Sequence, residues 1–299
     1  MGETAEFKSG FVGIIGRPNV GKSTLINTFV DQKIAITSDK PQTTRHKIRC
    51  IVNKENAQII FIDTPGFHKP KDPLGKHLNR AVRSTFKEVD VVIFMVDSSE
   101  IIGRGDAYIA SELSSIETPL VLVLNKMDKI KKSEIEAQMA AGRSLGDFTW
   151  IIPVSAKTGE NTAGLLSKII SLLPLGPRYY PGQMITDQPE KLIIAEFIRE
   201  KVLDLTTEEV PHSVAVEVEE MKPREGKDLV DIMAWIYVER ESQKGIVIGK
   251  GGSMLKEIGQ RARCDIEKLL GSRTNLQLRV KTKHKWRRDE KAVWQFGYG

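Results

Sequence analysis

The chain has 299 residues, 40% of them hydrophobic and 28% charged, with 45 Lys and Arg against 39 Asp and Glu and a formal net charge of +6. This length and composition predict two domains, each with a core of its own. Two distant cysteines, Cys50 and Cys264, exclude a disulfide framework and favour a reduced cytoplasmic protein. The polar residues at the start exclude a signal peptide. No apolar run approaches the roughly 20 residues that a membrane-spanning helix needs.

The first predicted functional element is a glycine-bearing loop between an apolar run at residues 11–15 and a helical pattern at residues 23–30. Such a turn points backbone N–H groups inward at the start of a helix and makes a concave site for phosphate groups. Lys22 would extend this site towards the β- and γ-phosphates, and the Ser23 hydroxyl would bind Mg²⁺. The alternative is that Gly21 is an ordinary turn glycine. The residues predicted to bind a nucleoside triphosphate are Gly16, Arg17, Pro18, Asn19, Val20, Gly21, Lys22, Ser23 and Thr24.

Two segments that follow are predicted to respond to the γ-phosphate. The polar segment 37–45 contains a threonine pair, of which Thr44, rather than Thr43, would complete the Mg²⁺ shell while the γ-phosphate is present. A loop of this kind is ordered by the triphosphate and released on hydrolysis. After a strand-like run, Asp63 would hold a Mg²⁺-bound water, since Mg²⁺ keeps several waters, and the N–H of Gly66 would face the γ-phosphate. This second segment consists of Asp63, Thr64, Pro65 and Gly66.

Two apolar runs further along the chain end in polar residues that fit guanine. The run at 119–124 ends in Asn125, Lys126, Met127 and Asp128, and the run at 151–154 ends in Ser155, Ala156 and Lys157. The Asp128 carboxylate can accept hydrogen bonds from N1–H and the N2 amine of guanine together, and adenine has no such pair of donors. Asn125 and the stem of Lys126 would brace the loop and the base, and a backbone N–H of the second segment would meet the guanine oxygen. Each segment alone fits a solvated loop, but both in this order behind a phosphate loop predict a GTP site.

These loops resemble those of the Ras-like, TRAFAC-class GTPases over residues 10–173, and the phosphate loop has the form typical of the branch that serves bacterial ribosome assembly. In that superfamily a glutamine usually follows the glycine of the Asp-x-x-Gly segment and orients the attacking water. Phe67 stands there instead, and because an apolar ring cannot polarise water, we expect slow intrinsic hydrolysis. The resemblance implies a bound K⁺, held partly by Asn19, where the alternative is a turn-forming residue. The predicted catalytic residues are Asn19, Lys22, Thr44 and Gly66.

The second half of the chain has a different pattern. Residues 174–182 are rich in Pro and Gly and predict a linker between domains. Helical spacing follows at residues 190–205, and alternating apolar residues then predict strands at 214–219, 230–239 and 276–282. Between the last two strands, a Gly-x-x-Gly turn at 249–252 joins two helical patterns.

This turn would let a nucleic-acid backbone approach closely, so that Lys250 and the following helix N-terminus meet its phosphates. Alone, the turn fits a glycine-rich corner between helices, and a run of charge fits a solvated face. Residues 240–288, however, hold 14 Lys and Arg against 4 Asp and Glu, and Trp286 and Trp294 are near for base stacking. The predicted RNA-binding residues are Ile248, Gly249, Lys250, Gly251, Gly252, Arg279, Lys281, Lys283, Trp286 and Arg287. The order of elements resembles a type II KH domain.

A Ras-like GTPase domain followed by a KH domain is the layout of the Era family of GTPases, which the chain resembles over nearly its whole length, including the basic tail at 285–290. The expected fold is an α/β P-loop domain at 8–174 with a mostly parallel sheet, a linker at 175–189, and an α+β KH domain at 190–299. The resemblance implies a cytoplasmic monomer that uses Mg²⁺, hydrolyses GTP under stimulation by RNA and K⁺, binds 16S ribosomal RNA near its 3′ end and acts in 30S subunit assembly. Some family members also contact the inner membrane peripherally.

Two alternatives stay open at this point. One is a constitutive RNA-binding protein whose nucleotide site is structural and slow. The other is a membrane-linked signalling GTPase that places its basic face on anionic lipid. A true switch must show reciprocal effects of RNA and nucleotide on each other's affinity, which separates it from the constitutive binder. Vesicle binding that competes with RNA would favour the signalling GTPase.

Overall fold

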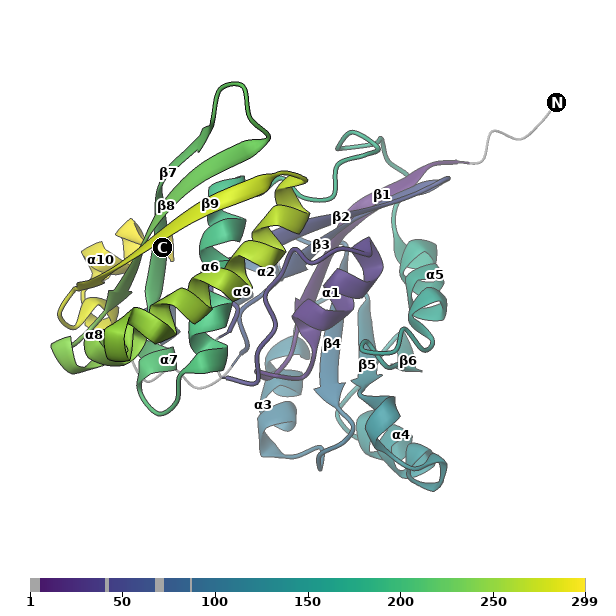
Figure 1. The fold of residues 1–299 in the computed structure, drawn as a ribbon. Helices are drawn as coiled ribbons and strands as arrows, with labels where there is room; N and C mark the ends of the chain where they lie inside the picture. The colour runs from purple at the N-terminus through teal and green to yellow at the C-terminus, as the bar shows by residue number, and fades with distance from the viewer. Residues whose placement is uncertain (1–5, 41–42, 68–72, 87, 299) are drawn as a thin grey trace. The chain divides into compact units, whose positions relative to one another are not determined.

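The computed structural model describes residues 6–40, 43–67, 73–86 and 88–298, and within them the chain separates into two compact units (Figure 1). The first unit contains the described residues up to Ala35 and those within 44–69 and 78–187. The second contains those within 36–43 and 70–77, together with the chain from Gln188 onward.

The first unit is built on a six-stranded sheet in the order β2-β3-β1-β4-β5-β6, in which every neighbouring pair is parallel except β2 with β3. Its strands are β1 (Lys8–Ile15), β2 (Ile48–Lys54), β3 (Ala57–Asp63), β4 (Val91–Asp97), β5 (Leu120–Asn125) and β6 (Trp150–Pro153). The α-helices that follow these strands are α1 (Lys22–Val30), α2 (Pro73–Thr85), α3 (Arg104–Leu113), α4 (Ile135–Arg143) and α5 (Thr162–Leu172). Two 3-10 turns after β5 are η1 (Met127–Lys129) and η2 (Lys132–Glu134).

The central strands of this sheet are fully buried, as parallel strands covered by helices are. All seven residues of β3 and all seven of β4 are buried. Phe94 and Leu122 of the sheet pack in one apolar cluster with Val82 of α2 and Ile109 of α3. Because the parallel strands end at the same edge of the sheet, the loops that follow β1, β3, β4, β5 and β6 gather there.

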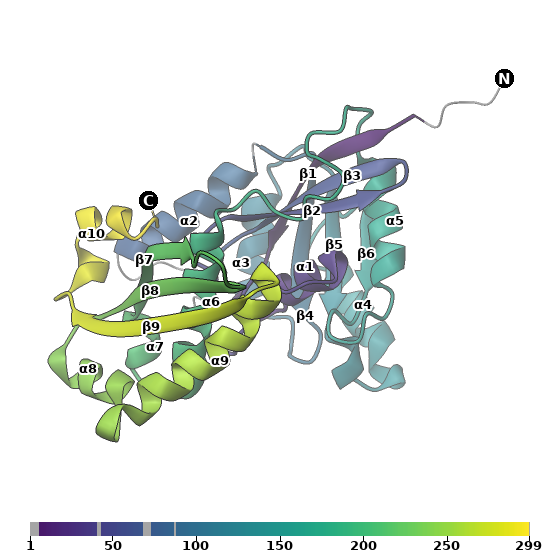
Figure 2. The ribbon, with the colours of Figure 1, turned by 45° about the horizontal axis from the view of Figure 1, so that its top comes forward.

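The second unit follows the predicted order of helix, strand, strand, helix, helix and strand, and Figure 2 shows α9 running along β9. Its sheet has the order β7-β8-β9, with β7 antiparallel and β9 parallel to β8. The elements are α6 (Glu190–Leu205), α7 (Val210–Ser213), β7 (Ala215–Pro223), β8 (Leu229–Val238), α8 (Glu241–Ile248), η3 (Lys250–Gly252), α9 (Ser253–Leu270), β9 (Arg273–Thr282), η4 (Trp286–Arg288) and α10 (Glu290–Gln295). Phe197 of α6, Ile258 of α9 and Ile236 of β8 are all buried and belong to its core.

The predicted linker does not lie free of the first unit. Leu175 forms a β-bridge with Lys8, and the N–H of Ile51 donates to the Ile185 carbonyl oxygen at 2.8 Å. The buried side chain of Gln58 accepts from the N–H of Tyr180 at 2.9 Å. The segment therefore packs along the strands of the sheet, and the boundary between the units falls after Asp187. Among the helices that the structure describes, none has both the length and the apolar composition needed to cross a bilayer.

Candidate functional site

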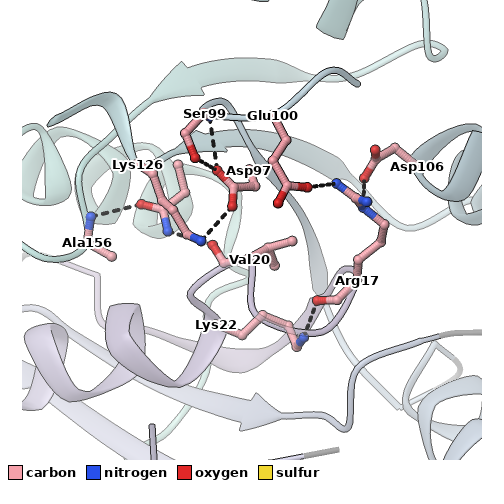
Figure 3. A network of polar contacts seen from close by, with 10 residues as sticks. Arg17, Val20, Lys22, Asp97, Ser99, Glu100, Asp106, Lys126 and Ala156 are labelled. Atoms are coloured by element: carbon pink, nitrogen blue, oxygen red, sulfur yellow. Dashed lines mark hydrogen bonds and ion pairs between the residues drawn. The ribbon is translucent and has the colours of Figure 1, made fainter. Parts of the chain in front are cut away.

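The predicted phosphate loop joins β1 to α1, and its lysine folds back inside it. Lys22 Nζ donates to the Arg17 carbonyl oxygen at 3.0 Å (Figure 3). It also donates to the Gly16 carbonyl oxygen at 3.2 Å, and the residue is buried. Burial lowers the pKa of Lys22 to about 8, against the opposing effect of the Asp63 carboxylate. Phosphate oxygens carry full negative charge and would be stronger partners for this ammonium group than neutral carbonyls. Lys22 is therefore placed for its predicted role.

Gly21 and Asn125 tie the phosphate loop to the predicted base-binding loops. The Asn125 side chain donates to the Val20 carbonyl oxygen at 2.7 Å and accepts from the N–H of Ala156 at 2.9 Å. Gly21 has φ 101°, and a Cβ on it would lie 2.2 Å from the Asn125 side-chain nitrogen. Any side chain at Gly21 would therefore strain the backbone and push the two loops apart.

Three oxygen-bearing side chains gather at the start of α1. Ser23 Oγ donates to Asp63 Oδ2 at 2.7 Å and lies 3.0 Å from Thr44 Oγ1. Burial raises the pKa of Asp63 to about 6, although the Lys22 charge and the bonds from Ser23 and Thr44 lower it. The buried Oδ1 of Asp63 has no hydrogen-bond partner among the described residues. Hydroxyl and carboxylate oxygens are ligands that Mg²⁺ takes from proteins, so this cluster fits that ion.

The polar segment 37–45 sends one of its two threonines to this cluster. Thr44 reaches Ser23, as stated above, whereas the Thr43 hydroxyl donates to the carbonyl oxygens of Lys40 and Ser38 at 2.5 and 3.3 Å. Residues 41 and 42 of the segment lie outside the described residues. The structure thus places the threonine chosen from the sequence, and not its neighbour, at the candidate metal site.

Phe67 is packed into the core of the first unit. Its ring is 1% exposed, stacks on Tyr108 with centroids 5.9 Å apart, and lies 5.9 Å from the Arg83 guanidinium carbon. Its N–H donates to the Gly16 carbonyl oxygen at 3.1 Å, so the backbone, rather than the ring, meets the phosphate loop. A Cβ on Gly66 would lie 2.7 Å from Pro18 Cγ, which shows how closely the two loops approach. Phe67 therefore anchors the loop and offers nothing that could orient water.

Asp128, the residue predicted to recognise guanine, lies in the loop that follows β5. Asp128 is exposed, and its Oδ1 accepts from the buried Ser155 hydroxyl at 2.6 Å. The N–H of Met127 donates to the Val154 carbonyl oxygen at 3.2 Å, which holds the two loops together. Among the described residues, only the Ser155 hydroxyl donates to this carboxylate, so Oδ1 is held and Oδ2 accepts no hydrogen bond. Of the predicted backbone donors to guanine, the N–H of Ala156 is already used by Asn125.

The predicted role of Arg17 at the phosphates applies only to its backbone. Its side chain leaves the loop towards α3, where Nε donates to Asp106 at 2.9 Å and the terminal nitrogen to Glu100 at 3.0 Å (Figure 3). Asp106 is fully buried and also accepts from the N–H of Gly103 at 3.2 Å. The guanidinium group therefore anchors the phosphate loop to α3 in this structure.

Asp97, the last residue of β4, is a further residue at the site that was not predicted from the sequence. Its Oδ2 lies 2.5 Å from Lys126 Nζ, and its Oδ1 accepts from the N–H and hydroxyl of Ser99 at 3.0 and 2.6 Å (Figure 3). Burial opposes ionisation of this carboxyl, but the bonds from Lys126 and Ser99 outweigh it and lower the pKa of Asp97. The signal was present, because the apolar run 91–96 ends in this acidic residue just as the run before Asp63 does.

The Gly-x-x-Gly turn stands beside a groove in the second unit. Gly251 and Gly252 have φ values of 60° and 81°, and no atom would lie within 4 Å of a Cβ on either. The groove has a volume of about 470 Å³ and runs between α9 and β9. It is lined by Gly252, Leu255, Lys256, Gly259, Gln260, Arg263, Asn275, Leu276 and Leu278. Of the lining residues, only Gly252 is among the predicted RNA-binding residues. The apolar side chains and the two cations, Lys256 and Arg263, offer contacts for bases and phosphates.

Trp286 was predicted to stack on bases, and this is wrong. The ring is fully buried, its Nε1 donates to the Ser213 carbonyl oxygen at 2.7 Å, and it packs edge-on against Phe296 with centroids 5.2 Å apart. A ring enclosed in this way has no face left for a nucleotide. Trp294 is 63% exposed and keeps such a face.

Other predicted RNA-binding residues of the tail and of β9 do not line the groove. Arg287 is paired with Glu239 at 2.7 Å, and Lys283 donates to the side chain of Gln295. Arg279 and Lys281 alternate along β9 with groove-lining Leu278, so they lie on the other face of the strand, where both approach the Trp235 ring at 5.6 and 5.7 Å. The four side chains therefore do not belong to the candidate groove.

Family models match both units. A model of 50S ribosome-binding GTPases matches residues 11–126, and a model of KH domains matches residues 209–287. The chain is 54% identical over 292 residues to GTPase Era of Alkaliphilus oremlandii (strain OhILAs), which covers 98% of the chain and 99% of that relative. It is 53% identical over 293 residues to GTPase Era of Clostridioides difficile (strain 630), with the same coverage.

Two solved structures are similar to the whole chain. One is a variant of Era from Aquifex aeolicus bound to GDP·AlF4⁻, with 40% identity, a TM-score of 0.95, and coverage of 98% of this chain and 100% of the other. The second is Era in complex with MgGDPNP and nucleotides 1506–1542 of 16S ribosomal RNA, with 41% identity, a TM-score of 0.93, and coverage of 98% and 99%. The Ras-like and KH folds predicted from the sequence are thereby confirmed.

Proposed function

The chain belongs to the Era family of GTPases, and on this premise we propose that it is a GTP-hydrolysing switch that binds 16S ribosomal RNA near its 3′ end during assembly of the 30S subunit. The observation that supports the proposal most is the joint presence of the Ser23–Thr44–Asp63 cluster and the groove beside the Gly-x-x-Gly turn. A similar Era binds MgGDPNP and a 16S ribosomal RNA fragment together. The protein would act as a cytoplasmic monomer, with peripheral contact to the inner membrane.

The first unit would bind GTP with Mg²⁺. Ser23 and Thr44 would bind the ion through their hydroxyl oxygens, and Asp63 would hold one of its waters. When bound, Mg²⁺ neutralises charge on the β- and γ-phosphate oxygens. Lys22 would exchange the carbonyl oxygens of Gly16 and Arg17 for phosphate oxygens, and the N–H of Gly66 would meet the γ-phosphate. These groups stabilise the charge that develops as the phosphoryl group leaves.

Hydrolysis would use K⁺ held partly by Asn19, since Phe67 is buried and no glutamine follows Gly66. Asn19 lies at the turn of the phosphate loop with φ 64°. Loss of one group that stabilises developing charge costs on the order of 10² in rate, so single-turnover hydrolysis should be about tenfold or more faster in K⁺ than in Na⁺. GTP affinity measured in both salts serves as the control. Equal rates in the two salts would contradict this part of the proposal.

The second unit would bind single-stranded RNA in the groove between α9 and β9. The open glycine turn lets the sugar-phosphate backbone come close, and Lys250, Lys256 and Arg263 supply positive charge around it. Leu255 and Leu278 provide apolar surface for bases. The sequence of the bound RNA would be read by groups along this groove.

The test of the switch is reciprocal linkage between the two ligands. We expect RNA to bind about tenfold tighter with a GTP analogue than with GDP, since allosteric coupling usually spans ~5–150-fold. Titration of a fluorescent single-stranded RNA with the protein in each nucleotide state measures this difference. An RNA affinity that is identical in all nucleotide states, including the nucleotide-free protein, would support the constitutive RNA-binding alternative instead.

A further inference from the structure

Asp97 ends β4 directly beside the base-binding segment of β5. It is in register with Asn125, and the N–H of Ser98 donates to the Asn125 carbonyl oxygen at 2.9 Å. Its Oδ2 lies 2.5 Å from Lys126 Nζ (Figure 3). We propose that Asp97 is a positioning residue that holds the Lys126 side chain in place for the guanine base and thereby slows nucleotide release. The inference rests on the guanine nucleotide site of the proposed function.

Lys126 needs such a partner to be ordered before nucleotide binds. Its backbone is left-handed with φ 66°, which is uncommon for a residue that has a Cβ. Its long side chain is 23% exposed and has many rotamers to lose when a ligand is bound. An ion pair that selects one of these rotamers in advance reduces the entropy lost on binding. The affinity for nucleotide should therefore depend on Asp97, although Asp97 itself need not touch the ligand.

Asp97 is built to act as a fixed anchor. The carboxylate is 6% exposed and stands at the end of a strand that is buried over its whole length. Both hydrogen bonds from Ser99 go to Oδ1, so Oδ2 remains directed at Lys126. A charge-assisted hydrogen bond shielded from water is stronger than the same bond between exposed groups.

The test compares nucleotide release from Asp97→Asn, Lys126→Met and the double variant. We expect Asp97→Asn to release GDP about tenfold faster, as the loss of one charge-assisted hydrogen bond predicts, with single-turnover hydrolysis of bound GTP unchanged. In the Lys126→Met background, Asp97→Asn should add nothing, because the group it positions is gone. Ser99→Ala, an exposed and conservative change, should give a smaller acceleration of the same kind. Glu136→Gln removes an exposed carboxylate that pairs with Arg143 on α4 instead, and should leave release unchanged.

The ratio of GDP affinity to IDP affinity shows whether Asp97→Asn affects only the position of Lys126 or disrupts the whole base-binding loop, Asp128 included. Hypoxanthine lacks the N2 amine that Asp128 would bind, so the ratio reports on Asp128 alone. We expect Asp97→Asn to weaken both nucleotides equally and to keep the wild-type ratio. Wild-type release from Asp97→Asn, additive effects with Lys126→Met, or a ratio that falls to one would each overturn the inference. A wild-type protein that does not distinguish GDP from IDP would instead overturn the guanine site of the proposed function.

Discussion

Asp128→Asn should convert a guanine nucleotide site into a site that prefers xanthine nucleotides. Guanine N1–H and the N2 amine would both donate to the Asp128 carboxylate, and two charge-assisted bonds of ~1.5–3 kcal/mol each are lost in the variant. GDP affinity should therefore fall by about a hundredfold or more. Xanthine carries an oxygen at C2, which would face the new amide, so XDP should gain affinity. Competition of GDP and XDP against a fluorescent nucleotide measures both changes.

The fold should survive this substitution. The oxygen of the new side-chain amide can still accept the hydrogen bond that the Ser155 hydroxyl donates to Asp128 at 2.6 Å in the wild type. Asp147→Asn removes the same charge from an exposed position in the first unit and is the matched control, for which we expect no change in either affinity. An Asp128→Asn protein that still prefers GDP over XDP would refute the assignment of the base reader.

Replacing Lys250 and Gly251 together by aspartate should abolish most RNA binding while GTP affinity is retained. Both residues are at the turn beside the groove, and Gly251 faces open space, so the new carboxylates would meet RNA phosphates directly. Like charges brought together in this way cost several kcal/mol, so RNA affinity should fall by on the order of a hundredfold. Titration with fluorescent single-stranded RNA, beside GDP binding by the same protein, measures the effect.

The chain offers a matched control in the turn between β7 and β8. Gly226 also has a left-handed backbone, with φ 70°, and no atom would lie within 4 Å of a Cβ on it, and the exposed Lys227 follows it. Replacing both by aspartate makes the same change in charge and a similar change in strain outside the groove. Equal losses of RNA binding in the two double variants would show that overall charge, rather than the groove, determines affinity. A simultaneous loss of GDP binding would indicate misfolding.

The nucleotide site was predictable because its residues lie in short loops that follow recognisable strands. The spacing from Gly16 to Ser23, and the segments that contain Asp63 and Asp128, each determine their local geometry with little help from the rest of the fold. Of the two threonines, Thr44 is the one that contacts Ser23, and its role at Mg²⁺ stays a prediction. Strand alternation in the second half likewise predicted the order of elements in that unit.

Side-chain direction was not predictable, because it depends on neighbours that are distant in sequence. Arg17 belongs to the phosphate loop, yet its guanidinium binds Asp106 on α3, 89 residues away. Trp286 lies in a basic tail, and this position suggests an exposed ring. The ring is buried instead, and its N–H donates to the carbonyl oxygen of Ser213, 73 residues away. The acidic end of the run 91–96 marks Asp97 in the sequence, but its pairing with the loop after β5 is visible only when β4 and β5 are placed in register. A motif specifies the backbone of its own loop and says little about which side chains tertiary packing will enclose.

The side chains that line the groove of the second unit were likewise not predictable from the sequence. A local excess of positive charge pointed to the part of the chain that the KH-domain model matches, but the residues chosen from it included Arg287, which is paired with Glu239. Lys256 and Arg263 were overlooked because helical patterns alone do not show which face of α9 turns towards β9. Charge density along a sequence therefore indicates a region of the chain but not which of its side chains line a groove.

The most direct measurement is GTP turnover in K⁺ buffer with and without a short single-stranded RNA that matches the 3′ end of 16S ribosomal RNA. The account predicts that the RNA accelerates turnover, because RNA bound to the second unit is expected to stimulate GTP hydrolysis in the first. An RNA of the same length and scrambled sequence is the control and should have a smaller effect. Unchanged turnover, together with tight RNA binding in every nucleotide state, would contradict the account and identify a constitutive RNA-binding protein.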